Sequence, residues 1–422
     1  MPSHSTYRYS PLGRPGCSIR LLRHYRSARD MTMRMFSLET FPVTDCPPFI
    51  AMSYTWEPRF PMHHLEIEPE QFLEIGHNLH LALNRICRIT GKAGNFRALY
   101  SERWKEWPEY ERRRFLEQTK YCCYFWIDAI CIDQSNIAER NQQIKLMGNI
   151  YSDAVSVMVW LGEEEERDPW AIARSLGDFD SILAKLQTMN ASKSIMERFF
   201  TMDDPSMTLR EKMTTLPYWN RLWIIQELML AQDILVCWGS SVFPWRCRER
   251  QRTAAGSRQR CDVCYSAETA EGSHPDEHRD LESLYSINNT HAWGGGSFHL
   301  IFDQRKFYER ISNRYRLPLD YLIEAFALHE CHDPRDKVYG LLGLVDTSDR
   351  TRFTTVTADY HRPVEDVYLD VLYVARESPR LKSMGAKWRF QEILRKALEI
   401  EGKAISFEQF VEDFNRRRTK WN

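Results

Sequence analysis

Trp223 and Glu227 lie four positions apart in the apolar stretch 217–230, so on a helix they share one face. Because this stretch is apolar nearly all round, we expect a single buried helix and a partly desolvated Glu227 carboxyl. A buried carboxyl needs a proton, a partner or a ligand. Two interpretations are open: a structural ion pair with Arg221 or another arginine, or a catalytic group.

Other polar or aromatic residues lie within, at the end of, or directly after two further apolar stretches: Ser53, Tyr54, Asp128, Asp133 and Gln134. In an open parallel sheet, ligands bind beyond the carboxyl ends of the strands, so these residues are candidate ligand contacts. Asp128 lies inside the predicted strand 124–130, where a hydrogen bond to a loop or to an arginine is the alternative role. Ser53 has no base beside it in a nucleophile motif, which argues against acyl transfer.

The elements that would position these residues alternate between strands and helices. Strands are predicted at 49–54, 124–130, 155–161 and 234–238. Between them, apolar residues at helical spacing predict a helix over 78–89 and another that begins after Asn136 and Glu139, which resemble a capping box. This order predicts an α/β fold with a parallel sheet flanked by helices.

The 422 residues divide into four stretches. Residues 1–48 are a lead-in with a strand at 18–22, and residues 49–245 form the α/β core. Residues 246–297 form an Arg-rich insert that we expect to be mobile, and residues 298–422 are mainly helical and pack on the core. The insert holds two cysteines and two histidines whose spacing is too short for a usual zinc finger, so we expect no metal: Cys261, Cys264, His274 and His278.

The charge and composition of the chain limit the classes of partner that it can bind. Lys and Arg total 57 against 58 Asp and Glu, so no net charge attracts the chain to nucleic acid or to an anionic membrane. The N-terminus has no apolar signal region, and no run of 18 apolar residues predicts a membrane span. The odd count of 11 cysteines argues against a disulfide framework. We therefore expect a cytoplasmic protein that binds neither nucleic acid nor membrane.

Four blocks of the sequence resemble the signature motifs of the heterokaryon-incompatibility (HET) family, and they occur in the family's order. They are AMSYTW at 51–56, the long block at 126–162, RLWIIQE at 221–227, and DPRDKVYGLLGL at 333–344 with residues 359–368 after it. The chain departs from the family pattern at Glu57, where glycine is usual, and at Asp133, where asparagine is more common. The Glu57 departure and the Arg-rich insert leave room for a decayed member without activity. We expect the tryptophans of the four motif blocks to be mainly core anchors. Two of them, Trp56 and Trp223, are also candidate ligand contacts.

The resemblance implies a role in self/non-self recognition and programmed cell death, exerted through protein partners or self-association. It also implies remote similarity to Toll/interleukin-1-receptor-like (TIR) folds, and thus a TIR-like or flavodoxin-like core. Some TIR modules cleave NAD with a glutamate in a W-x-x-x-E arrangement, the spacing of Trp223 and Glu227. The alternative function is therefore an assembly-activated NAD glycohydrolase, in which Glu227 would hold the ribose hydroxyls and stabilise an oxocarbenium-like centre. NAD would then be a substrate, and no cofactor is expected.

Overall fold

The computed structural model describes residues 5–13, 16–26, 34–56, 61–67, 71–89, 124–163, 216–239, 241–245, 301, 317–345, 356–376 and 378–401. The Arg-rich insert, with its two cysteines and two histidines, lies outside the described residues, and so does Glu57. The boundaries of the four predicted stretches stay predictions.

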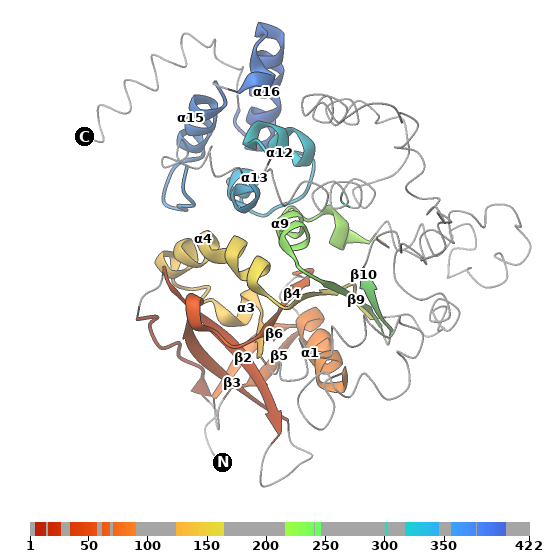
Figure 1. The fold of residues 1–422 in the computed structure, drawn as a ribbon. Coiled ribbons are helices and arrows are strands. Elements are labelled where there is room, and N and C mark those ends of the chain that lie inside the picture. Colours follow the sequence, from red (N-terminus) through yellow and green to blue (C-terminus); the bar gives the residue numbers. More distant parts are fainter. Residues whose placement is uncertain are drawn as a thin grey trace, which may run out of the picture.

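The four predicted strands lie side by side in the middle of a seven-stranded sheet (Figure 1). They are β4 (Phe49–Tyr54), β7 (Tyr124–Trp126), β8 (Ser156–Trp160) and β9 (Ile234–Trp238), and each pairs in parallel with its neighbours in this group. Nearly all their residues are buried, which is why they appear in the sequence as continuous apolar runs.

Antiparallel strands extend this group on both sides, so the sheet is mixed and the prediction of a wholly parallel sheet is wrong. The additional strands are β2 (Ser18–Arg26), β3 (Arg34–Pro42) and β10 (Ser241–Trp245). The full order is β10-β9-β8-β4-β7-β2-β3. A second, three-stranded sheet was not predicted; it has the order β1-β6-β5 and contains β1 (Ser5–Thr6), β5 (Met62–Glu66) and β6 (Gln71–Gly76).

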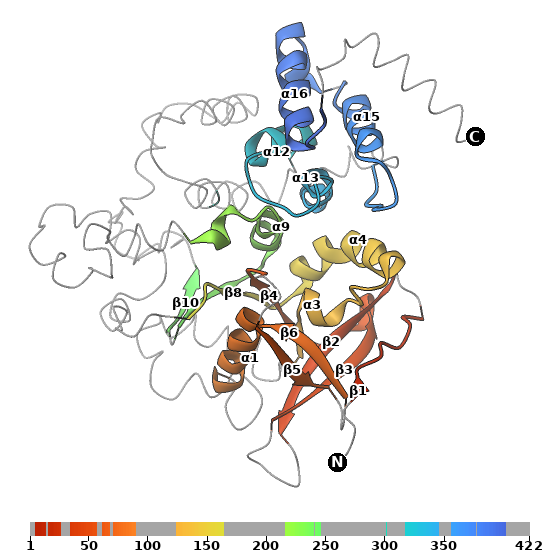
Figure 2. The same ribbon diagram turned by 180° about the vertical axis from the view of Figure 1, so that it is seen from behind.

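The parallel strands are doubly wound around β4. From β4 the chain passes through α1 (His77–Ile89) to β7, and from there through α4 (Ile137–Asp153) to β8 on the other side of β4. In both views α4 lies above the sheet beside α9 (Trp223–Leu230), whereas α1 lies below it (Figures 1 and 2). Ligand crevices of doubly wound sheets lie where the strand order reverses, which here is beyond the carboxyl ends of β4 and β8.

Helix α4 begins at a cap that the sequence signalled. The Asn136 side chain accepts a hydrogen bond from the Glu139 backbone N–H at 3.1 Å, as in a capping box. The Glu139 carboxylate does not complete the box. It forms a buried ion pair with Arg20 of β2 at 2.5 Å and accepts a hydrogen bond from the Asp133 N–H at 2.8 Å. The pair therefore ties the start of α4 to a strand that is distant in sequence.

The single helix predicted over 217–230 is instead two elements, the 3-10 helix η5 (Pro217–Asn220) and α9. Glu330 causes the interruption, because its N–H donates to the Asn220 carbonyl at 2.5 Å and its carbonyl accepts from the Leu222 N–H at 2.8 Å. The Asn220 carbonyl and the Leu222 N–H thus bond to another segment, whereas the Arg221 N–H still bonds to Tyr218 of η5.

The C-terminal region is mainly helical, with α12 (Leu319–Phe326), α13 (Asp336–Tyr339), α15 (Val364–Ala375) and α16 (Met384–Ala397). The 3-10 helix η7 (Leu342–Leu344) packs against both α4 and α9 and joins this region to the sheet layer. Among the helices in the described ranges, none has the length and apolar character needed to cross a membrane.

Candidate functional site

A buried polar cluster lies between the carboxyl end of β4 and the inner face of α9. The Glu227 side chain, only 2% exposed, points from α9 toward the sheet and accepts a hydrogen bond from the Ser53 hydroxyl. The Tyr218 hydroxyl of η5 lies 2.6 Å from the Ser53 oxygen. Three elements that are separate in the sequence thus bring their polar groups together inside an apolar core.

Burial in this core raises the pKa of Glu227 from 4.5 to about 7. The positive charge of Arg221 and the hydrogen bond from Ser53 oppose the shift without cancelling it. Among the residues that the structure describes, Glu227 has no ion-pair partner, so the structural ion pair with Arg221, one of the two interpretations of this residue, is not formed. Glu227 is therefore a carboxyl that exchanges its proton near neutral pH.

Arg221 interacts with several groups of the cluster. Its guanidinium donates a hydrogen bond to the Tyr54 carbonyl at the end of β4. Its charge also lowers the pKa values of Glu227 and Asp128 against the effect of burial. One guanidinium thus faces two carboxyls, which leaves the cluster one positive charge short when both carboxyls are ionised.

Asp128 was expected inside a strand, and this expectation is wrong. Strand β7 ends at Trp126, and Asp128 begins the one-turn helix α3 (Asp128–Cys131). Its carboxylate accepts hydrogen bonds from the Ala129 N–H at 2.7 Å and from the Trp56 indole N–H at 3.0 Å. Burial raises the pKa of Asp128, and these bonds, together with Arg221, lower it.

Trp56 differs from the other tryptophans of the motif blocks. Its side chain is 49% exposed, so the expectation of a core anchor is wrong for this residue, whereas Trp126 and Trp160 are fully buried. The bond to Asp128 fixes the indole at the carboxyl edge of the sheet. Asn78 fixes the same loop, since its amide donates to the Thr55 carbonyl at 2.8 Å.

The other candidate residues lie beside the cluster. Gln134 donates to the Asp128 carbonyl at 2.9 Å, and Asp133 accepts hydrogen bonds from Ser135 in the same turn. Trp223 is on α9 with Glu227, but its indole donates to Asp336 of the C-terminal region at 3.2 Å. The structure therefore brings Ser53, Tyr54, Trp56, Asp128 and Glu227 together and connects Trp223 to a different neighbour. Their roles in binding or catalysis stay predictions.

Sequence reasoning missed two tyrosines of the cluster. Tyr151 of α4 donates to the Met52 carbonyl at 3.1 Å and lies close enough to Glu227 for each to shift the other's pKa. Its place on the apolar stripe of α4 indicated only a core residue. Tyr218 gave no signal because its neighbours are also aromatic or apolar. In the described ranges, no group of three or more His, Cys, Asp or Glu side chains is placed to hold a metal ion.

Comparison with known proteins shows that the chain is similar to heterokaryon-incompatibility proteins. Residues 110–227 match the family model described as "Heterokaryon incompatibility protein (HET)", a segment that contains the second and third motif blocks. The chain is also 26% identical over 387 residues to "Heterokaryon incompatibility protein 6, OR allele" of Neurospora crassa. This alignment covers 83% of the chain and 51% of the relative, so the chain spans about half the length of that protein. No solved structure matches the chain.

Proposed function

We propose that this chain, whose predicted resemblance to the HET family is confirmed, acts in heterokaryon incompatibility. In this proposal it works in the cytoplasm in self/non-self recognition. Assembly with a protein partner or with a second copy triggers programmed cell death. The name of the Neurospora crassa relative states heterokaryon incompatibility, and this supports the first part of the proposal.

The observation that carries the proposal is that the four motif blocks form one packed unit. The first block lies in β4, the second runs from the end of β7 through α4 to β8, and the third is in α9. The fourth, in α13 and η7, is distant in sequence yet packs on α4 and α9. The resemblance therefore extends over a single structure and not over scattered matches.

The buried cluster would hold the edge of this unit in one conformation. Hydrogen bonds from Arg221 and Asn78, and the bond that the Trp56 indole donates to Asp128, fix the loop after β4. The exposed Trp56 indole is the largest apolar group there. Large aromatic side chains that are already fixed make favourable centres of protein interfaces. We therefore place the contact that starts assembly at Trp56.

Expression of the full chain in a filamentous fungus, fused to a domain that dimerises on addition of a small molecule, tests the proposal. We expect the dimeriser to stop growth and to admit a membrane-impermeant dye into the cells. The Trp56→Ala variant should need more dimeriser, whereas Trp388→Ala, which removes an exposed tryptophan from the distant helix α16, should respond like the unmodified chain. Unchanged growth of cells that contain folded, dimerised protein would refute assembly as the trigger.

NAD hydrolysis is the second candidate, favoured by the carboxyl of Glu227, which is buried without an ion pair. The geometry favours hydrolysis less than assembly, because the Ser53 hydroxyl already donates a hydrogen bond to this carboxyl and the Glu227 side chain is almost inaccessible to solvent. Nicotinamide release by the dimerised protein, and its loss in Glu227→Gln, would support hydrolysis. Cell death that persists in Glu227→Gln, without nicotinamide release, would leave assembly alone as the mechanism.

A further inference from the structure

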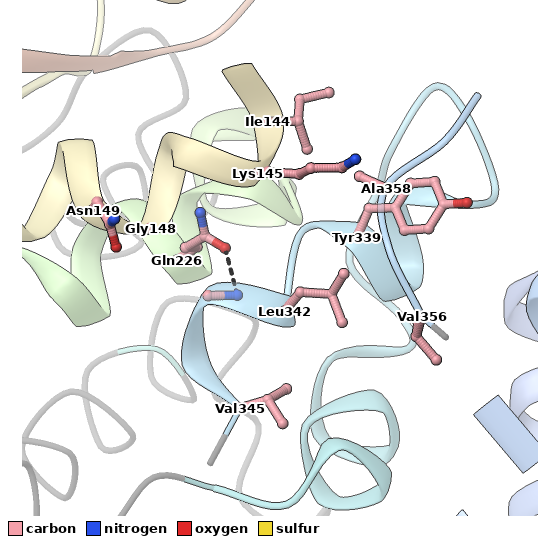
Figure 3. Close-up of a pocket in the computed structure, with 11 residues that line it drawn as sticks. Ile144, Lys145, Gly148, Asn149, Gln226, Tyr339, Leu342, Val345, Val356 and Ala358 are labelled. Atoms are coloured by element: carbon pink, nitrogen blue, oxygen red, sulfur yellow. Dashed lines mark hydrogen bonds between the residues drawn. The ribbon is translucent and has the colours of Figure 1, made fainter. Parts of the chain in front are cut away.

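A cavity of about 280 Å³ separates the core from the C-terminal region (Figure 3). Its walls come from α4, from α9, and from the segment through α13 and η7 with residues 356 and 358. A cavity of about 150 Å³ is enough to admit benzene, so this one has room for a molecule about twice that size. Nothing in the buried cluster around Glu227 lines it.

About half of the cavity wall is apolar. Ile144 of α4 lies on one side, and Leu342, Val345 and Val356 lie on the other (Figure 3). Tyr339 contributes its ring, while its hydroxyl turns away and donates to the Asp359 carbonyl at 3.1 Å. These walls suit the hydrocarbon part of a ligand.

The polar groups at the cavity offer hydrogen-bond donors. Gln226, 2% exposed, accepts a hydrogen bond from the Gly343 N–H at 3.1 Å through its oxygen, and its amide nitrogen has no partner in the described residues. Lys145 extends along the opening toward Ala358, and within the same residues its ammonium forms neither an ion pair nor a hydrogen bond. No acidic side chain is among the lining residues. Both nitrogens can donate hydrogen bonds to an acceptor on a ligand.

The cavity is fixed in shape before any ligand enters. Gly148 of α4 and Gly343 of η7 approach so closely that a Cβ on Gly148 would lie 3.2 Å from the Gly343 Cα. The bond between Gln226 and Gly343 holds η7 against α9 as well. A ligand would therefore lose little affinity to ordering of the protein.

We infer that this cavity binds a small anion with an apolar body, such as a medium-chain carboxylate. The carboxylate would accept hydrogen bonds from Lys145 and the Gln226 amide, and the hydrocarbon chain would lie against Ile144, Leu342 and Val356. Because the walls belong to both parts of the chain, the ligand would fasten the C-terminal region to the core. This goes beyond the proposed function, which needs no ligand.

Calorimetric titration of the full chain with octanoate, and with octanol as the uncharged analogue, tests the inference. We expect octanoate to bind at one site, and Lys145→Met to weaken it about tenfold or more, the effect of losing a charge-assisted hydrogen bond. Octanol should bind more weakly and be insensitive to Lys145→Met. The control Lys382→Met removes an exposed lysine of the C-terminal region and should leave the affinity for octanoate unchanged.

A second variant, Ile144→Trp, places a larger side chain in the cavity and should abolish octanoate binding. Thermal unfolding of each variant shows whether it is folded. Equal affinity of octanoate for the unmodified chain and Lys145→Met would overturn the inference. So would octanoate binding that survives in folded Ile144→Trp, or an absence of binding to the folded, unmodified chain.

Discussion

Replacement of Glu227 by glutamine should change how the stability of the protein depends on pH. The carboxyl has a pKa of about 7 in the folded chain and 4.5 as the reference value. The folded state therefore binds the proton more tightly than the unfolded state does, and the free energy of unfolding falls as pH rises between these values. From pH 5 to pH 8 the wild type should lose about 2 to 3 kcal/mol through this residue alone.

Glu227→Gln removes the charge and keeps an oxygen that can accept the hydrogen bond from Ser53. Its free energy of unfolding, measured by urea denaturation and tryptophan fluorescence, should thus rise relative to the wild type by that amount between pH 5 and pH 8. The measured quantity is how the difference in free energy of unfolding between Glu227→Gln and the wild type changes with pH. An effect of the substitution that is the same at every pH therefore cancels. Glu163→Gln, at an exposed position after β8, is the matched control and should follow the wild type at every pH.

A constant difference between Glu227→Gln and the wild type would refute this reasoning. It would mean that burial does not raise the pKa of the carboxyl in the folded chain. An ion pair with Arg221 would lower the pKa below 4.5, so the wild type would lose stability only as the pH falls below about 4.5, outside the interval from pH 5 to pH 8. The pH dependence therefore distinguishes a lone buried carboxyl from a structural ion pair.

Three further substitutions have expected outcomes in the same denaturation assay. Arg20→Met leaves Glu139 as an unpaired buried charge and should cost about 3 to 5 kcal/mol; an effect below about 1 kcal/mol would contradict burial of the pair. Asn136→Ala removes the cap of α4 and should cost about 1 kcal/mol, whereas Asn136→Ser should restore most of it. Trp56→Ala should cost less than about 1 kcal/mol because the side chain is half exposed, and a large loss would show that Trp56 supports the core.

The parallel part of the sheet could be predicted from the sequence because its strands are buried on both faces. β4, β8 and β9 appear as mainly apolar runs, and the capped start of α4 separates two of them. The strand β5 could not be predicted in this way, since its sequence MHHLE has a single buried residue. Strands with little burial carry little periodic signal.

Two errors in the prediction come from hydrogen bonds, in one case between distant segments and in the other between neighbouring residues. The apolar stretch 217–230 has a helical composition, but Glu330 takes the backbone bonds of Asn220 and Leu222, and the helix divides there. Asp128 lies in an apolar run that looks like a strand, yet its own carboxylate accepts from the next backbone N–H and starts a helical turn. Propensity cannot report partners that are separated by many residues.

The candidate site was partly predictable because a polar side chain in an apolar segment is costly unless it is paired. This rule singled out Glu227 and Asp128, whereas Ser53 was singled out by its place at the end of a predicted strand. The structure gives each of the three a hydrogen-bond partner. It could not find Tyr151 or Tyr218, because a tyrosine in a core is accounted for by its ring alone. The role of a buried tyrosine hydroxyl can be inferred only when its hydrogen-bond partners are known.

Side chains of α9 connect the buried cluster to the C-terminal region. Glu227 bonds to Ser53 of the sheet, whereas Trp223 bonds to Asp336 and Gln226 bonds to Gly343. A short helix held by both neighbours cannot shift without breaking bonds to one of them. A partner or ligand that moves α9 together with the C-terminal region would therefore change the environment of the Glu227 carboxyl. Because burial sets the pKa of that carboxyl, loosening of α9 would lower the pKa toward its ordinary value and release a proton near neutral pH.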